Sequence, residues 1–389
     1  MRFAEFTDEW GKYELSHFVT RITRRNKNNE SSLPLTISAQ YGLVDQISFF
    51  NKTVASVDLS GYYLLYNGDF AYNKSYSNDY AWGAVKRLDK YEKGCLSSLY
   101  FVFRPNDNID SDYLTHYFES SKWHKGISNI AGEGARNHGL LNMAVDDYFA
   151  TKHYLPSLPE QKKIARVFNA ITRRIGIQNK IIEDLKVLKK ELCAKLFGSP
   201  LCGRIIAIEQ VADIYGGYAF NSKAYVNKGK YKIVTIGNVT GDKYISGNYN
   251  TIDRLPNNIQ KPQVLSKGDI LVSLTGNVGR ISIVDGDEYL LNQRVAKLGI
   301  EDDLTKEYIY QYLSNSSFEK DMINAGQGAA QKNIKNQDIL SYCIRFPTDQ
   351  TALENIDKLL SLYDMRITSE KAILSNLILQ KSYYLRAMF

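Results

Sequence analysis

The sequence predicts an α+β fold in which two tandem, mostly-β domains alternate with two long antiparallel coiled-coil helices, related by a pseudo-two-fold internal repeat. Apolar residues recur in alternating steps of four and three from Ile164 and again from Ile356, as on the seam of a coiled-coil helix. Short strand-like runs, such as 99–103 and 232–236, precede each of these segments. Matching segments in the two halves indicate a duplication, which fixes the order domain, helix, domain, helix.

The two apolar ladders agree residue by residue at an offset of 192 positions. The offset also reproduces the polar interruptions, because Gln178 and Lys189 correspond to Glu370 and Lys381. A shared pattern of defects indicates duplication rather than two unrelated amphipathic helices. The residues expected to pack between the helices are Ile164, Phe168, Ile171, Ile175, Ile182 and Leu185 in the first ladder, and Ile356, Leu360, Tyr363, Ile367, Leu374 and Leu377 in the second.

The globular halves repeat as well, with an offset that drifts as small insertions would cause. Gly68-Asp69 matches Gly268-Asp269, and the glycine-rich segment 132–135 matches 326–329. Short helices are expected over 112–120 and 306–314. The predicted organisation is therefore a first domain over 1–155, a helix over 156–198, a second domain over 199–347 and a helix over 348–389.

Composition limits the function classes. Lys and Arg number 49 against 42 Asp and Glu, a net charge of +7 that favours an acidic partner such as nucleic acid. The four cysteines form no CxxC pair, so neither a disulfide framework nor a zinc site is expected. No signal-peptide or membrane-span pattern occurs, which predicts a cytoplasmic protein without a membrane partner.

The motifs of DNA-modifying enzymes are missing. None of the eight prolines follows Asn or Asp and no two are adjacent, so the Asn/Asp-Pro-Pro-aromatic run of amino-methyltransferases is absent. No phosphate-binding loop and no Pro-Asp opening of a nuclease metal site occur. We therefore expect no catalytic residue, no metal and no cofactor on this chain.

The residues resemble the specificity subunits of type I restriction–modification systems. Residues 158–165, Leu-Pro-Glu-Gln-Lys-Lys-Ile-Ala, are similar to the family's entry into its central conserved helix. The second entry, 346–350, keeps the Pro and the Gln but lacks the Ile-Ala. Residues 210–217 resemble the start of a target-recognition domain, and the N-terminal half, with 35–38 and 68–72, resembles a different subtype of that domain.

This resemblance implies a non-catalytic subunit in which each target-recognition domain reads one half of a bipartite site in double-stranded DNA. Two modification (methyltransferase) subunits would dock on the helices, which set the spacer, and restriction (nuclease/translocase) subunits would join them. S-adenosylmethionine, ATP and Mg are then expected on those partners.

Base contacts require polar side chains on loops that can enter a groove. The segments after each Gly-Asp pair and after each glycine-rich segment are loop-like, polar and different in the two copies. The candidate DNA-binding residues are Lys74, Ser75, Tyr76, Arg136, Asn137 and His138 in the first domain, and Thr275, Asn277, Arg280, Gln327, Gln331, Lys332 and Asn333 in the second.

Two other classes of function remain open from the sequence. A self-contained DNA methyltransferase or restriction enzyme conflicts with the missing motifs. A coiled-coil adaptor that binds only proteins conflicts with the paired but divergent polar loops.

Overall fold

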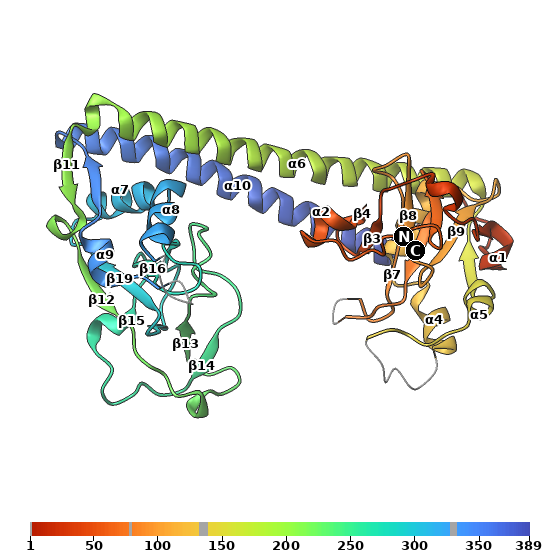
Figure 1. Cartoon of the computed structure of the whole chain (residues 1–389), viewed down its shortest axis with the longest axis horizontal. Coiled ribbons are helices and arrows are strands. Elements are labelled where there is room, and N and C mark those ends of the chain that lie inside the picture. Colours follow the sequence, from red (N-terminus) through yellow and green to blue (C-terminus); the bar gives the residue numbers. More distant parts are fainter. Residues whose placement is uncertain (1, 78–79, 132–138, 327–332) are drawn as a thin grey trace. The chain divides into compact units, whose positions relative to one another are not determined.

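The chain folds into two compact units. The computed structural model describes residues 2–77, 80–131, 139–326 and 333–389 (Figure 1). The first unit comprises Met1–Gln178 and Ile373–Phe389, and the second comprises Asn179–Ala372. Each unit therefore contains one globular part together with a portion of both long helices, α6 (Leu158–Gly198) and α10 (Gln350–Met388).

The globular part of the first unit combines short strands with small helices. Its elements are β1 (Gly11–Glu14), α1 (Leu15–Phe18), β2 (Val19–Arg21), η1 (Lys27–Asn29), β3 (Leu35–Ser38), β4 (Gly42–Asp45), α2 (Gln46–Phe50), β5 (Tyr63–Tyr66), β6 (Phe70–Asn73), β7 (Ala84–Arg87), β8 (Lys93–Leu96), β9 (Phe101–Pro105), α3 (Ser111–Glu119), α4 (His124–Ile130), α5 (Val145–Phe149) and β10 (Lys152–Leu155).

The second unit repeats this plan between the long helices. Its elements are η2 (Pro200–Cys202), β11 (Arg204–Ala207), η3 (Ile208–Gln210), β12 (Asp213–Gly216), η4 (Ser222–Ala224), β13 (Tyr231–Val234), β14 (Asn250–Ile252), η5 (Lys261–Gln263), β15 (Val264–Leu265), β16 (Ile270–Ser273), β17 (Ile281–Ile283), β18 (Tyr289–Leu291), β19 (Val295–Gly299), α7 (Asp303–Leu313), α8 (Ser316–Ala325), α9 (Asn336–Leu340) and β20 (Cys343–Phe346).

The sheets have the same strand order in both units. The main antiparallel sheets run β2-β9-β6-β7 and β12-β19-β16-β17, and two-stranded ribbons β1-β10 and β11-β20 join the ends of each globular part. In the second unit another sheet runs β14-β13-β18-β15, with β13 parallel to β18. The first unit has the pairs β4-β3 and β8-β5, linked by a parallel bridge from Pro34 to Cys95. The duplication seen in the sequence is thus a duplication of topology.

Local chemistry explains why corresponding elements start at corresponding places. Gly68 and Gly268 both have positive φ, at 87° and 91°, which glycine adopts without steric cost. The carboxylate of the following Asp accepts a backbone N–H three residues earlier, from Tyr66 at 2.7 Å and from Ser266 at 2.9 Å. These turns precede β6 and β16.

The helices that follow the main sheets are also capped alike. Asp110 and Asp302, which lie 192 positions apart, accept the backbone N–H of Tyr113 and Thr305 at 2.8 and 2.7 Å. An N-terminal aspartate satisfies a free helix N–H and favours the helix dipole. The expected helices over 112–120 and 306–314 are present as α3 and α7.

The long helices pack against one another in opposite directions within each unit. In the first unit, Ile164 and Phe168 near the start of α6 share a core with Met388, and Phe168 lies 5.5 Å from the Phe389 ring. In the second unit, Cys193 and Phe197 near the end of α6 share a core with Ile356 and Leu360 of α10. In each unit the beginning of one long helix packs against the end of the other, so the two helices are antiparallel.

All twelve ladder residues are buried or partly buried. Ile164, Phe168, Ile171, Ile182, Ile356, Leu360 and Leu377 are buried, and Ile175, Leu185, Tyr363, Ile367 and Leu374 are partly buried. The predicted α+β class with two long helices is confirmed. The compact units divide both helices, so the four-segment division of the chain stays a prediction. No helix among the described residues combines the length and apolar character needed to cross a bilayer.

One buried histidine makes the first unit sensitive to acid. His153 on β10 is 2% exposed, and its two ring nitrogens lie 2.9 Å from the Tyr117 hydroxyl and 2.8 Å from the Thr151 hydroxyl. Burial lowers the pKa of His153 to about 4, because the charged imidazolium would lose its hydration. The unfolded chain binds this proton near the usual pKa of about 6.5. The contribution of neutral His153 to the free energy of unfolding is therefore fully present above pH 6.5, and it is lost as the pH falls toward 4.

We predict that His153→Gln removes about 3 kcal/mol of the pH dependence of unfolding between pH 6.5 and pH 4. The three tryptophans, Trp10, Trp82 and Trp123, all lie in the first unit, so urea unfolding followed by tryptophan fluorescence reports this unit alone. Equal pH dependence in the variant and the parent would contradict the assignment.

Candidate nucleic-acid interface

Each unit ties together two loops that are far apart in the sequence. In the first unit, Leu141 donates its backbone N–H to the Lys74 carbonyl at 3.0 Å, and Tyr76 donates to the Gly139 carbonyl at 2.9 Å. In the second unit, Ile334 donates to the Leu274 carbonyl at 3.0 Å, and Thr275 bridges Asn333. The loop after β6 or β16 therefore lies beside the residues that follow the glycine-rich segment, as the duplicated candidate positions require.

The first-unit candidates differ in how free their side chains are. The Lys74 ammonium lies 4.7 Å from the centroid of the Phe101 ring, and burial lowers the pKa of Lys74. Ser75 is exposed and donates its backbone N–H to Asn73 Oδ1, while the Tyr76 side chain is 40% exposed. Ser75 and Tyr76 are thus the described candidates of this unit that expose their side chains. Arg136, Asn137 and His138 lie outside the described residues.

In the second unit three of the candidates, Thr275, Arg280 and Asn333, form side-chain hydrogen bonds within the protein. The Thr275 hydroxyl donates to Asn333 Oδ1 at 2.9 Å, which holds the loop pair together. Arg280 Nε donates to Glu319 Oε1 at 3.2 Å. Asn277 is exposed, and its backbone carbonyl accepts from the Ser273 hydroxyl. Gln327, Gln331 and Lys332 lie outside the described residues.

The turn that presents Asn277 depends on glycine. Gly276 and Gly279 have φ values of 76° and 78°, which side chains with a Cβ rarely adopt. A Cβ on Gly279 would also lie 2.8 Å from the Cβ of Met322 on α8. The turn therefore packs closely against this helix, and this packing fixes the position of Asn277.

A charge network that the sequence did not reveal fixes the second globular part to its helices. Asp364 on α10 is 8% exposed and accepts from Lys189 of α6 at 2.5 Å and from Gln311 of α7 at 2.7 Å. Lys243, in the segment between β13 and β14, lies 3.4 Å from the same carboxylate and 3.4 Å from Glu307. One carboxylate thus joins both long helices to two parts of the globular domain.

The first unit contains a related network around Glu119 of α3. Lys381 of α10 lies 2.9 Å from Glu119, and His116 Nδ1 lies 3.3 Å from it. His116 Nε2 lies 2.7 Å from Asn169 of α6. Burial alone would raise the pKa of Glu119, but the hydrogen bonds and charges of His116 and Lys381 outweigh it and lower the pKa to about 2.

Lys189 and Lys381 occupy the same repeat position, 192 residues apart. Each is a polar interruption of its apolar ladder, and each pairs with an acid of its own unit. The interruptions were visible in the sequence, but Asp364 and Glu119 stand at different repeat positions and gave no signal. Among the described residues, no group of three or more His, Cys, Asp or Glu side chains could hold a metal ion.

Comparison with known proteins shows which family this duplicated scaffold is similar to. Residues 204–378 match the model of the type I restriction modification DNA specificity domain. The type I restriction enzyme MjaVIII specificity subunit of Methanocaldococcus jannaschii is 27% identical in an alignment of length 303 that covers 70% of this chain and 69% of the relative. The putative MjaX specificity subunit of the same organism is 25% identical, covering 88% of this chain and 84% of the relative. Residues 204–378 thus match the specificity domain of type I restriction–modification systems, and the chain is similar over most of its length to specificity subunits of such systems.

Solved structures show the same fold along the whole chain. The S subunit of a type I restriction–modification system from M. genitalium aligns over 100% of this chain and 97% of its own, with a TM-score of 0.56 and 16% identity. A chain from a study of complex assembly and conformational transition of the type I R-M system aligns over 99% and 98%, with a TM-score of 0.55 and 18% identity.

We predict that Asp364→Asn destabilises the packing of the second globular part against its helices by about 3 kcal/mol, because two partly buried lysines lose a shared counter-charge. Amide exchange in α7 should then be roughly 100-fold faster by hydrogen–deuterium exchange, since each 1.4 kcal/mol is a factor of about ten. Glu183→Gln, which removes an exposed pair with Lys186, serves as the control and should leave exchange unchanged. Equal protection in D364N would show that the network carries no positioning role.

Proposed function

We propose that this chain is the DNA-sequence-reading subunit of a type I restriction–modification complex, with each domain reading one half of a bipartite target. The observation that carries the proposal is a scaffold that both units share, with loops that differ between them. The strand order and the pairing of loops are the same in both units. The residues presented after the equivalent strands differ, since 74–76 is Lys-Ser-Tyr and 274–276 is Leu-Thr-Gly. Two copies that read different bases require this combination.

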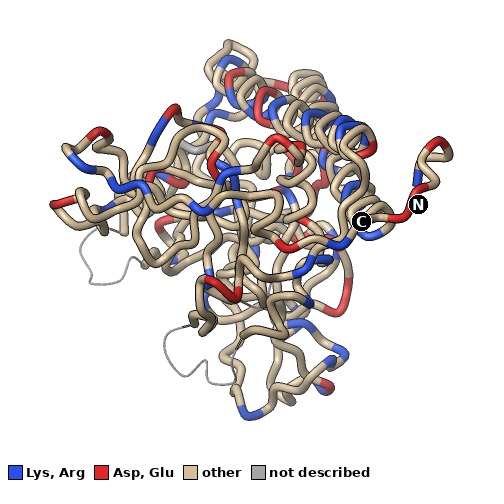
Figure 2. Tube along the Cα trace, turned by 90° about the vertical axis from the view of Figure 1, so that its right-hand side faces the viewer, with Lys and Arg blue, Asp and Glu red and all other residues tan. Residues whose placement is uncertain are grey.

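The long helices are proposed to dock the modification subunits. Although their ladders are buried, both helices also expose large apolar side chains, including Ile177, Val187, Leu188, Leu362, Met365 and Leu379, each at least half exposed. Along these helices Lys and Arg intermix with Asp and Glu (Figure 2). Exposed apolar side chains among mixed charges suit a protein partner. The duplication provides two such surfaces, which fits two modification subunits. These subunits would carry S-adenosylmethionine. Restriction subunits would carry out the ATP- and Mg-dependent steps, and the complex would act in the cytoplasm.

The helices are also proposed to set the unspecified spacer between the half-sites. A 41-residue α-helix such as α6 is about 60 Å long at ~1.5 Å per residue. Half-sites one duplex turn apart are ~34 Å apart, so helices of this length are sufficient for the role.

Exposed loop residues provide the test of base reading. We predict that Tyr76→Ala relaxes the sequence of one half-site and Asn277→Ala relaxes the other, each by about 1–3 kcal/mol of discrimination. Methylated positions are mapped by long-read sequencing of a host expressing the complex. Each variant controls for the other, because the untouched half-site must keep its sequence. If both variants leave both half-sites unchanged, these loops do not read bases.

Shortening the helices tests the spacer. We predict that removing residues 174–180 and 366–372 together shortens the spacer by about three base pairs, since seven residues span about 10 Å and a base-pair step about 3.4 Å. Whole-heptad deletion at matching repeat positions preserves the seam. Unchanged spacing in the methylation map, with a folded and active complex, would overturn the proposed ruler.

A methylation assay on the purified chain separates this proposal from a self-contained enzyme. The chain alone with S-adenosylmethionine should transfer no methyl group, and activity should appear when modification subunits are added. Binding to a target duplex separates it from a protein-only adaptor, provided that the salt concentration is held constant.

A further inference from the structure

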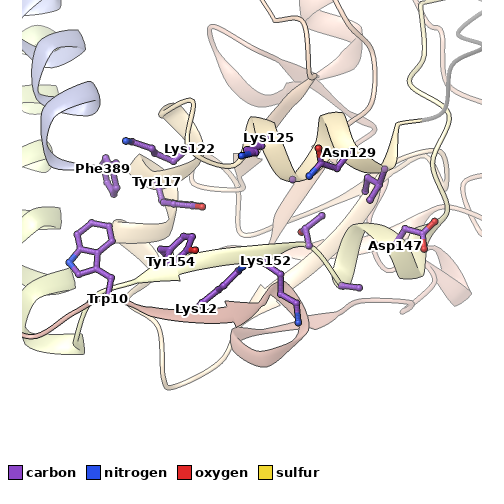
Figure 3. Close-up of a pocket in the computed structure, with 14 residues that line it drawn as sticks. Trp10, Lys12, Tyr117, Lys122, Lys125, Asn129, Asp147, Lys152, Tyr154 and Phe389 are labelled. Atoms are coloured by element: carbon purple, nitrogen blue, oxygen red, sulfur yellow. The ribbon is translucent and has the colours of Figure 1, made fainter.

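A basic cleft in the first unit lies between the β1-β10 ribbon and α4. Its volume is about 600 Å³. Figure 3 shows Lys12 and Lys152 on the ribbon side, Lys122 and Lys125 on the α4 side, and Trp10 with Phe389 toward one end. Lysines thus line the cleft from both sides. Asp147, at the other end, is the carboxylate among the lining residues.

Two of these lysines are already occupied and two are available. Lys152 pairs with Glu14 at 2.6 Å, and the Lys12 ammonium lies 5.6 Å from the centroid of the Tyr154 ring. For Lys122 and Lys125, no carboxylate within the described part of the chain lies at ion-pair distance. An unbalanced positive charge therefore faces the cleft, which suits an anionic ligand.

The duplicated scaffold does not explain this charge. The registers Gly11↔Leu155 and Arg204↔Phe346 make the two ribbons equivalent. In that alignment Lys12 corresponds to Ile205, and Lys152 corresponds to Cys343. The two lysines of this ribbon are therefore not repeated in the second copy, where Arg345 stands at the position of Tyr154.

The cleft is also close in sequence to the candidate base-reading loops of its own domain. Asn129 and Ile130 line it, and they stand at the end of α4, immediately before the glycine-rich segment. Residues 139–141, which pair with the loop 74–76, follow that segment. The lining residues of the cleft and the paired loops are therefore neighbours along the chain, on the two sides of the glycine-rich segment.

We propose that this cleft binds the phosphodiester backbone of the DNA that adjoins the first half-site, independently of base sequence; the inference rests on the proposed function. The cleft offers lysine point charges from two sides, and none of the described residues that line it is an arginine, whose fork suits bidentate recognition of a base or carboxylate. Such charges neutralise phosphates and release counterions, which contributes affinity but no sequence information.

The test compares Lys122→Ala/Lys125→Ala with the parent chain, each assembled with its modification subunits, on the mapped target duplex and on a random duplex of equal length. Two lost phosphate contacts should reduce the slope of log K against log salt by about 1.8. From 50 to 200 mM salt the parent should then lose about 12-fold more affinity than the variant. The loss should be equal on both duplexes, and the methylated sequence should not change.

Two controls match this variant. Lys122→Arg/Lys125→Arg keeps the charge and should restore the parent slope. Lys320→Ala removes an exposed lysine of α8, the second unit's counterpart of α4, and should leave the slope unchanged. An equal effect of K320A would overturn the assignment to the cleft.

The remaining outcomes also decide the proposal. An unchanged slope in the double alanine variant overturns it. An unchanged slope with weaker binding of a modification subunit would assign the cleft to an acidic segment of that partner instead. Failure of the proposed function is distinguishable, because the parent complex would then show no preference for a bipartite target.

Discussion

The burial of one apolar face on each long helix is the interaction on which the rest of the structure depends. Phe168 and Leu360, each fully buried, lie in the cores of different units and on different helices. Burying a side chain of this size stabilises by about 1.5–3 kcal/mol. Because each globular core includes residues of both helices, neither the domains nor the helices form a separate layer. Each globular part is therefore joined to both helices through a common core.

Polar residues at the edges of these cores fix how each globular part is oriented on its helices. An apolar stripe allows neighbouring elements to slide, whereas a partly buried carboxylate must keep its partners. Asp364 satisfies this need with Lys189 and Gln311, and Glu119 does so with Lys381 and His116. The two solutions use the same lysine position but different acids. Each domain is therefore fixed to the helices by its own set of contacts.

Duplication explains both the similarity of the units and the place where they differ. Strand order, the Gly-Asp turns and the aspartate caps are shared, because they specify the scaffold. The loops beyond β6 and β16 differ in sequence, and Lys12 and Lys152 have no lysine at the equivalent ribbon positions of the second unit. Differences at exposed, polar loop positions are what two domains with different DNA contacts would retain.

The sequence by itself determined the repeat, the two helices and the family resemblance, because helical periodicity and repeated motifs are local patterns. It also placed the candidate loops, although six of the thirteen candidates lie outside the described residues. Only the tertiary structure decided that Ser75 lies beside Leu140 and that Thr275 uses its hydroxyl on Asn333. It alone showed that Arg280 is paired with Glu319. These contacts join residues far apart in the chain, and periodicity carries no information about which distant side chains meet.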